Sequence, residues 1–207
     1  MAKLTAQFYD RDTVQVAREL VGKYLVRWLD QQLLVCRITE TEAYIGRCDK
    51  ACHAYNYRRT QRTETLFAPP GTAYIYLIYG MYHCLNFVTE PAGEPCAVLI
   101  RGGKILHGED TVSQLRFGKL PHELTAYQRK NFLNGPGKLC KGFALTREQN
   151  GISLTGDTLF VCDSPEDVGL PPEDPDALPT QLQVGKRIGI DYAEEAIEFP
   201  WRFFTAP

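Results

Sequence analysis

Residues 71–86 read GTAYIYLIYGMYHCLN, and this stretch decides the fold class. Apolar and aromatic residues fill two short runs, Thr72–Ile78 and Tyr82–Val88, on either side of Tyr79-Gly80-Met81. Glycine permits the sharp bend that joins two antiparallel strands. The pattern therefore predicts a β-hairpin that carries Tyr79 at its tip.

The rest of the chain adds further strands and separate helices. Hairpins with segregated helices indicate an α+β fold, not a doubly wound sheet. We expect one compact mixed domain over residues 1–207, with a curved antiparallel sheet, flanking helices and a protruding hairpin. The other expected strands are Tyr24–Leu29, Leu33–Tyr44, Cys96–Arg101 and segments around Leu182–Ile190 and Ile197–Phe204. One helix is expected to start at Asp12 or Thr13 and another at Gly135-Pro136. Two more helices are expected near Thr111–Phe117 and over His122–Phe132.

The composition limits the class of protein. Of the 207 residues, 44% are hydrophobic and 11% aromatic, which is enough to fill the core of one domain. No apolar run is long enough to span a bilayer, and the N-terminus lacks the apolar region of a secretory signal. We expect an intracellular protein, cytoplasmic in a bacterium or nuclear in a eukaryote. No glycine-rich phosphate-binding motif is present, so no nucleotide cofactor is expected.

The cysteines do not indicate a disulfide framework or a metal site. Their number is seven, which is odd, and they are scattered along the chain. Free, reduced thiols are the expected state. The one cluster, Cys48…Cys52-His53, has a spacing that matches no standard zinc site. We therefore expect no metal.

Charge is unevenly distributed along the chain. The net charge of −2 argues mildly against nucleic acid binding. However, the irregular segment 46–70 begins with a basic run, whereas acidic residues gather in a proline-rich connection at 165–179. A charge run is most often a solvated surface, but a basic loop is also compatible with phosphate contacts. The cations of this loop are Arg47, Lys50, Arg58, Arg59 and Arg62.

Residues 36–44 read CRITETEAY and hold two closely spaced carboxylates. A carboxylate that emerges from an apolar strand face is partly desolvated, which raises its pKa and suits it to act as a general base for water. Two solvated glutamates at an exposed strand end are the simpler explanation of this segment alone. With a period of two, the residues predicted to share one face are Cys36, Ile38, Glu40, Glu42 and Tyr44.

Tyrosines crowd the predicted hairpin. Tyr74 and Tyr76 share a strand face, where aromatic side chains can stack on a base. Tyr79 at the tip is placed as a wedge that could enter between base steps. Cross-strand packing is the simpler explanation for Tyr74 and Tyr82, although Tyr74 stays a candidate for base binding. Asn86, a polar residue on an apolar strand, needs hydrogen-bond partners or a function.

A carboxylate, several aromatic faces, a wedge and a basic loop are together what a base-flipping enzyme needs. Motifs in one order along nearly the whole chain resemble the alkyladenine (3-methyladenine) DNA glycosylase family. The family's fold is a single compact mixed domain, in agreement with the predicted hairpins. The matching motifs are ETEAY (40–44), His53, PGTAYIYLIYGMY (70–82), Asn86, CAVLIR (96–101), GPGKLC (135–140), RIGI (187–190) and PWRFF (200–204).

The resemblance implies a role for each matched position. Glu42 is expected to be the general base that activates water to attack the sugar C1′. Tyr44 is expected to stack on one face of the flipped base, and His53 and Tyr76 on the other. Asn86 is expected to exclude purines that carry a 2-amino group. The expected DNA contacts from the matched positions are Tyr79, which fills the gap in the duplex, and Arg101. The basic loop adds Arg58 and Arg59 as expected contacts, and the GPGKLC motif adds Lys138.

The implied activity is that of a monofunctional DNA repair enzyme. It would flip 3-methyladenine, 7-methylguanine, hypoxanthine or ethenoadenine out of duplex DNA and hydrolyse the N-glycosidic bond. No lysine stands at a matched catalytic position, so no Schiff base with the sugar is expected. The expected partner is double-stranded DNA with damaged purines, and the expected state is a monomer without cofactor or membrane contact.

Two other classes of protein stay open. An enzyme that hydrolyses free nucleosides would use the carboxylate and the aromatic residues but would not need Tyr79 at a hairpin tip. A non-catalytic module that binds lesions or RNA would not need Glu42 beside the aromatic residues.

Overall fold

Antiparallel hairpins laid edge to edge build the sheet of this protein. The structure is a computed structural model, which describes residues 2–179 and 181–205. Within these residues, eight strands form one sheet in the order β3-β4-β5-β2-β1-β6, with β8 paired to β2 and β7 paired to β8. The strands are β1 (Tyr24–Leu29), β2 (Gln32–Ile45), β3 (Ala73–Ile78), β4 (Tyr82–Thr89), β5 (Cys96–His107), β6 (Leu159–Cys162), β7 (Leu182–Gly185) and β8 (Arg202–Thr205).

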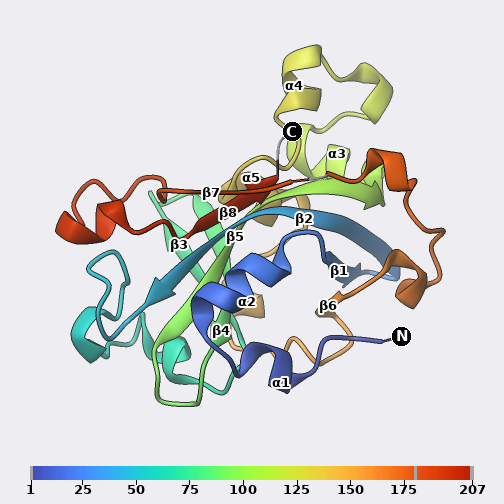
Figure 1. The fold of residues 1–207 in the computed structure, drawn as a ribbon. Helices are drawn as coiled ribbons and strands as arrows, with labels where there is room; N and C mark the ends of the chain where they lie inside the picture. The colour runs from blue at the N-terminus through green and yellow to red at the C-terminus, as the bar shows by residue number, and fades with distance from the viewer. Residues whose placement is uncertain (1, 180, 206–207) are drawn as a thin grey trace.

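β2 has other strands paired along both of its edges. β5 pairs along one edge of β2, whereas β1 and then β8 pair with successive parts of its other edge. The strands wrap into a half-barrel around β2 and β5 (Figure 1). The predicted α+β class, with a curved antiparallel sheet in a single mixed domain, is confirmed.

Short helices cover this sheet. α2 packs on β2 and β5, and its predicted start is confirmed because the Asp12 carboxylate accepts a hydrogen bond from the backbone N–H of Gln15 at 2.9 Å. α5 packs on β4 and β5, and it begins at Pro136 as predicted. None of the helices in the described ranges is long and apolar enough to cross a membrane. The α-helices are α1 (Ala6–Tyr9), α2 (Thr13–Leu20), α3 (Glu109–Phe117), α4 (Ala126–Lys130) and α5 (Pro136–Gly142).

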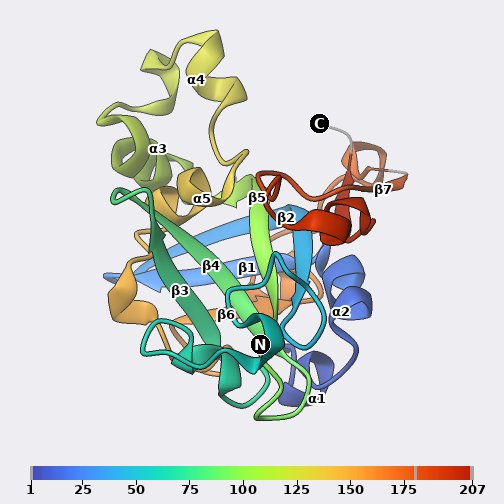
Figure 2. The ribbon, with the colours of Figure 1, turned by 90° about the vertical axis from the view of Figure 1, so that its left-hand side faces the viewer.

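The β3–β4 hairpin has the predicted three-residue tip. Ile78 pairs with Tyr82, and Tyr79 and Gly80 adopt left-handed backbone angles, with φ of 52° and 70°. Tyr79 is 80% exposed. The tip lies on the same side of the molecule as α3 and α5 (Figure 2). The sheet therefore holds a tyrosine in solvent at a fixed place beside these helices.

Side chains of this hairpin alternate between two environments. Ala73, Ile75, Leu85 and Phe87 belong to the main hydrophobic core. The residues between them point to the opposite face of β3 and β4, where Tyr74 and Tyr76 pack in a second, smaller cluster. One face of the hairpin thus stabilises the fold, and the other is free to build a site.

The prediction that alternate residues of β2 from Cys36 to Tyr44 share one face is wrong in one respect. Its pairing register with β5 shifts between Ile38 and Thr41, which marks a β-bulge. As a result Ile38 and Ala43 both lie in the main core, although five positions separate them. Glu42 and Tyr44 therefore lie on the face opposite to Ile38, whereas strict alternation placed them on the same face. The bulge aims Glu42 away from the main core.

Some predicted elements differ from those observed. In place of a helix over His122–Phe132, a 3-10 turn at Pro121–Glu123 precedes the five-residue α4. Thr125 has an extended backbone, and its hydroxyl accepts from the N–H of Gln128, so the helix starts afresh there. Beyond β7 the chain leaves the sheet at Gly185, so the predicted strand to Ile190 ends early, and β6 was not predicted.

Candidate functional site

A cavity of about 500 Å³ lies on the face of the sheet opposite to the main core. Its walls come from β3, β4 and β5, the first turn of α5 and the segment 188–192 after β7. Cavities of this size with mostly aromatic and apolar walls are typical of small-molecule sites. The aromatic side chains that line it are Tyr44, His53, Tyr74, Tyr76, Tyr79, Tyr82 and Tyr192.

Glu42 lies behind the cavity wall, with a side chain that is fully buried. Its Oε1 accepts a hydrogen bond from the backbone N–H of Ile188 at 2.8 Å, and its Oε2 accepts one from the Tyr44 hydroxyl at 2.7 Å. Burial raises the pKa of Glu42 above its usual range, and the nearby Arg101 opposes this rise. Glu42 is thus a desolvated carboxylate that its partners hold in one orientation.

Arg101 connects Glu42 with a second carboxylate. Its Nη1 is 3.4 Å from Oε2 of Glu42, and its Nε donates to Glu40 at 3.1 Å. Glu40 also accepts from Nε of Arg202 at 2.7 Å. Arg101 lines the cavity, whereas the two carboxylates do not. The network presents a guanidinium to the cavity and keeps the carboxylate charge directly behind it.

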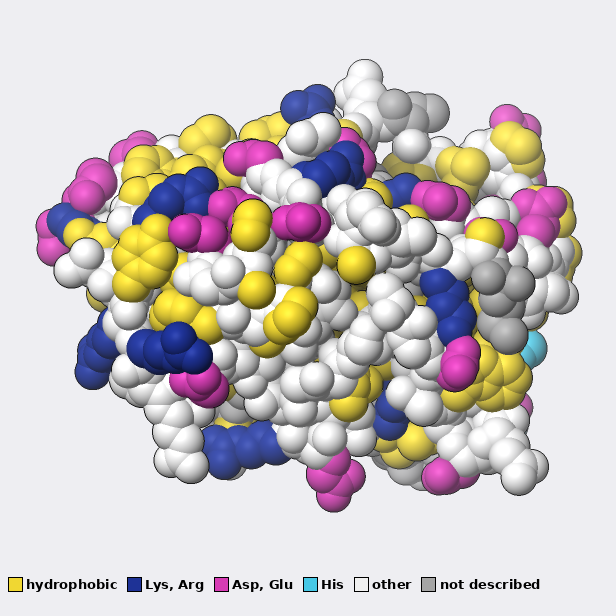
Figure 3. Space-filling view, turned by 90° about the horizontal axis from the view of Figure 1, so that it is seen from below, with side chains coloured by type: hydrophobic (Ala, Val, Ile, Leu, Met, Phe, Trp, Pro, Cys, Tyr) yellow, Lys and Arg dark blue, Asp and Glu magenta, His cyan; other side chains and the backbone are white. Residues whose placement is uncertain are grey.

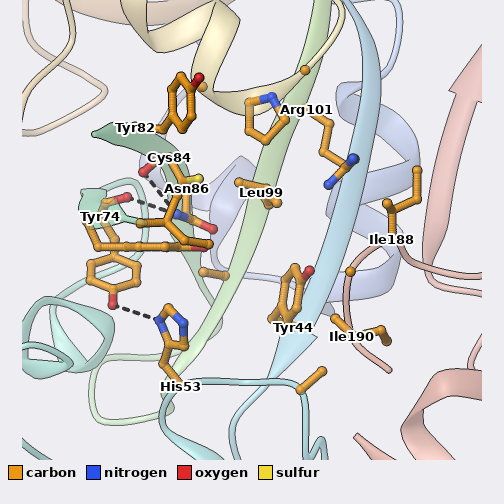
Figure 4. Close-up of a pocket in the computed structure, with 18 of the residues that line it drawn as sticks. Tyr44, His53, Tyr74, Tyr82, Cys84, Asn86, Leu99, Arg101, Ile188 and Ile190 are labelled. Atoms are coloured by element: carbon orange, nitrogen blue, oxygen red, sulfur yellow. Dashed lines mark hydrogen bonds between the residues drawn. The ribbon is translucent and has the colours of Figure 1, made fainter. Parts of the chain in front are cut away.

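The aromatic walls face each other across the cavity. Figure 4 shows Tyr44 and Ile190 on one side, and His53 and Tyr74 on the other. The ring centroid of His53 lies 4.5 Å from that of Tyr76 in an edge-on arrangement. Its Nδ1 is 3.2 Å from the Tyr74 hydroxyl. The gap between the two walls is bounded by aromatic surface on both sides, so it can hold a flat ring system.

His53 carries no charge at neutral pH. Its burial in the cavity wall, with a further contribution from the charge of Arg62, lowers the pKa of His53 to about 4. A neutral imidazole offers one ring nitrogen as a donor and the other as an acceptor. It can therefore contact a base without adding a positive charge to the cavity.

Asn86 lies at the back of the cavity on β4. Its side-chain amide donates to the backbone carbonyls of Tyr74 at 3.1 Å and of Cys84 at 3.3 Å. The two hydrogen bonds fix the side chain, as Figure 4 shows. The buried polar residue thus has partners, and it also occupies space inside the cavity.

The predicted DNA-contacting residues do not form one cluster. Tyr79 and Lys138 line the cavity near its opening, and Nζ of Lys138 donates to Asn131 at 2.8 Å. Arg58 and Arg59 are exposed outside the cavity, and Arg59 is paired with Glu64 at 2.6 Å. On the face opposite α4, Figure 3 shows cationic and anionic side chains interspersed.

The structure also shows the environment of the cysteines and the arrangement of possible metal ligands. No cysteine forms a disulfide in the structure, and Cys52 is buried in the cavity wall while Cys48 is exposed. In the described part of the chain, no group of three His, Cys, Asp or Glu side chains is arranged to hold a metal ion.

A family model described as methylpurine-DNA glycosylase (MPG) matches residues 7–207. The chain belongs to this family. A protein of Clostridium perfringens strain 13 with the name "Putative 3-methyladenine DNA glycosylase" is 49% identical over 203 residues, which cover 98% of this chain and 95% of that protein. Proteins with the same name from Alkaliphilus oremlandii and Bacillus cytotoxicus are 45% and 46% identical over 202 residues, again 98% of this chain and 95% of each relative.

Membership of the methylpurine-DNA glycosylase family confirms the resemblance read from the motifs. It makes the chain an enzyme of the DNA glycosylase class, which acts in the repair of alkylation damage. The family match also covers every motif noted in the sequence, from ETEAY (40–44) to PWRFF (200–204).

Sequence reasoning missed one part of this candidate site. Arg187 stands in the matching motif RIGI without an assigned role, and the sequence analysis did not single out Asp49. The two side chains form a fully buried ion pair behind Tyr44. Ile188, the next residue, supplies the backbone N–H that binds Glu42. Because 138 positions separate Arg187 and Asp49, no local pattern could pair them.

Proposed function

We propose that this chain flips a damaged purine out of duplex DNA and hydrolyses its N-glycosidic bond, which leaves an abasic site. The substrates are alkylated or deaminated purines: 3-methyladenine, 7-methylguanine, hypoxanthine and ethenoadenine. The observation that carries the proposal is the buried, hydrogen-bonded carboxylate of Glu42 directly behind an aromatic cavity whose opening holds the exposed Tyr79. A base can enter such a cavity only after it leaves the stack.

The aromatic walls select the base. A purine alkylated at N3 or N7 carries a positive charge, and a cation over a desolvated aromatic face gains about 0.5–2 kcal/mol. In our proposal Tyr44 stacks on one face of the base, while His53 and Tyr76 contact the other, with Tyr74 holding His53 through its hydroxyl. Neutral His53 adds no repulsion to a cationic base. Asn86, whose side chain is fixed in that space, opposes a 2-amino group and so keeps out unmodified guanine, whereas the positive charge of 7-methylguanine offsets this conflict through the aromatic walls.

Glu42 supplies the chemical step. As an anion it takes a proton from water, the water oxygen attacks C1′, and the electron pair of the breaking C1′–N bond leaves with the base. On an alkylated purine this pair neutralises the positive charge, so the base needs no acid. The same anion stabilises the cationic sugar in the transition state. Tyr44 and the N–H of Ile188 favour the anionic form against the cost of burial.

The remaining residues act on the DNA. Tyr79 fills the gap that the flipped base leaves, and Arg101, Lys138, Arg58 and Arg59 contact the nucleotide or its phosphates. Lys138 donates to Asn131 and Asn134 through Nζ, which supports a binding role and not attack on the sugar. We therefore propose hydrolysis without strand cleavage, by a monomer. Because the similar proteins come from bacteria, we place the reaction in the bacterial cytoplasm, where the DNA lies.

A pair of variants tests this proposal. Glu42→Gln should reduce base release from a duplex with one 7-methylguanine by about 10²–10⁴-fold, the range for loss of a general base. Glu40→Gln is the matched control, since Glu40 lies on the same strand and binds the same Arg101, but its other partner is Arg202 and not Tyr44 or the N–H of Ile188. Its rate should stay within about tenfold of wild type, because it only orients Arg101.

Three outcomes would contradict the proposal. Equal rates for Glu42→Gln and wild type would remove Glu42 from the chemical step. Lesion-dependent binding without release by any of the proteins would favour a non-catalytic module. Full activity of Tyr79→Ala on free inosine, with none on duplex DNA by any form, would favour a nucleoside hydrolase.

A further inference from the structure

A buried ion pair lies on the side of Tyr44 that faces away from the cavity. Arg187 and Asp49 have fully buried side chains, and Nη2 of Arg187 is 2.8 Å from Oδ1 of Asp49. The guanidinium carbon of Arg187 lies 4.7 Å from the centroid of the Tyr44 ring. Tyr44 lines the cavity and Arg187 does not. The Tyr44 ring therefore separates a buried cation from the space in which the base would stack.

The position of the pair is fixed by the surrounding backbone. Nη1 of Arg187 donates to the carbonyl of Ala43 at 2.8 Å, and the Asp49 carboxylate accepts from the N–H of Ala51 at 2.9 Å. The guanidinium carbon also lies 5.2 Å from the centroid of the Trp201 ring. The charges thus stay at constant distances from Tyr44, so their effect on the ring is also constant.

A cation behind an aromatic ring changes what the ring binds in front. The face of a neutral tyrosine attracts a cation, whereas a positive charge behind the ring repels one. Asp49 offsets part of the charge of Arg187, and its two carboxylate oxygens bind the Nη1 and Nη2 groups of the guanidinium. The balance between the two charges therefore sets the potential that a base meets on Tyr44.

We propose that the Arg187–Asp49 pair determines the preference of the cavity for cationic over neutral damaged bases. The proposal rests on the glycosylase function proposed above, and it assigns to the pair a role in specificity and not in the chemical step. Arg187 and Asp49 act through Tyr44, so they are positioning residues. A purely structural role would reduce activity on every lesion by the same factor, and the ratio of activities separates the two possibilities.

The experiment compares two lesions in one duplex sequence. We would measure kcat/KM for 7-methylguanine, which is cationic, and for hypoxanthine, which is neutral, each opposite cytosine at one pH and salt concentration. Asp49→Asn leaves the cation without its counter-ion and should lower the ratio of kcat/KM for 7-methylguanine to kcat/KM for hypoxanthine about tenfold. This is the order expected for a unit charge that is separated from the base by a few times the distance between stacked rings, at an effective dielectric near 20. Arg187→Gln removes the cation and should raise the ratio at least about threefold.

A control separates charge balance from loss of stability. Glu173→Gln removes the partner of another well-buried arginine, Arg37, whose Nη1 is 2.9 Å from Glu173. Neither side chain lines the candidate cavity. This variant should lose stability but keep the wild-type ratio, so a changed ratio in Glu173→Gln would overturn the proposal.

The remaining outcomes are also decisive. Opposite shifts of the ratio in Asp49→Asn and Arg187→Gln support the proposal, whereas equal losses on both lesions overturn it. If Asp49→Asn does not fold, Arg187→Gln decides alone. A raised ratio supports the proposal, and an unchanged or lowered one overturns it. Failure of wild type to release either base would instead contradict the glycosylase function itself.

Discussion

The hydroxyl of Tyr44 offers a way to separate the two roles proposed for that residue. Tyr44→Phe keeps the ring that lines the cavity but removes the hydrogen bond of 2.7 Å to Oε2 of Glu42. That bond favours the anionic carboxylate, so its loss raises the pKa of Glu42 further above the usual range. Glu42 must be an anion to accept a proton from water. The rate of base release should therefore fall at a higher pH in the variant than in the wild type.

The size of the effect follows from the partners of Glu42. A hydrogen bond to a charged group contributes about 1.5–3 kcal/mol. The variant keeps two other partners of Glu42, the backbone N–H of Ile188 and the guanidinium of Arg101, so we take the lower end of this range. About 1.5 kcal/mol corresponds to about a tenfold change in the ratio of anionic to protonated Glu42. At acidic pH, where this ratio limits the rate, Tyr44→Phe should be about tenfold slower than wild type. At alkaline pH, where Glu42 is an anion in both proteins, the rates should converge.

The assay is single-turnover release of 7-methylguanine, a base that leaves without being protonated, at a series of pH values and saturating enzyme. The wild-type rate should rise with pH through the raised pKa of Glu42, above the range of a solvated glutamate. The acidic limb of the variant should lie at higher pH. An equal loss at every pH would refute this reasoning, because it would show that the hydroxyl acts on packing or binding alone.

Three further predictions concern the cavity walls and the hairpin tip. Because burial lowers the pKa of His53 to about 4, its ring should show no protonation step near pH 6.5 in an NMR titration, and a step there would contradict the buried, neutral ring. Tyr79 is 80% exposed, so Tyr79→Ala should fold normally and yet lose about tenfold or more in kcat/KM on duplex DNA, with a smaller loss on single strands; equal losses would refute the wedge role. Asn86→Ala should open the space at the back of the cavity and allow measurable guanine release, and no gain with guanine would place the exclusion elsewhere.

Much of the fold follows from local pattern. The Tyr79-Gly80-Met81 tip, the alternation on β3 and the start of α5 at Pro136 each depend on a few neighbouring residues, and the structure has them as predicted. The helix expected over 122–132 fails because Thr125 caps a new helix inside the segment. The end of β7 at Gly185 depends on where the chain turns back toward Glu42. No local sequence pattern reveals this position.

The site was predicted less completely than the fold. The aromatic residues and Glu42 were expected together, but on the assumption that β2 alternates regularly, whereas a bulge brings Glu42 and Tyr44 to the cavity face. The partners that control the charge state of Glu42 come from far along the chain. The N–H of Ile188 is 146 positions away from Glu42, so only the folded structure shows this contact.

The most direct test of the account is an analysis of the products that wild-type protein forms from duplex DNA carrying a single 3-methyladenine. The account predicts free 3-methyladenine in solution, together with a strand that stays intact until alkali cleaves it at the abasic site. Failure to release the base would contradict the proposed function of the cavity. A strand cut by the protein itself, before alkali, would contradict the proposed attack by water and point to attack by an amine such as that of Lys138.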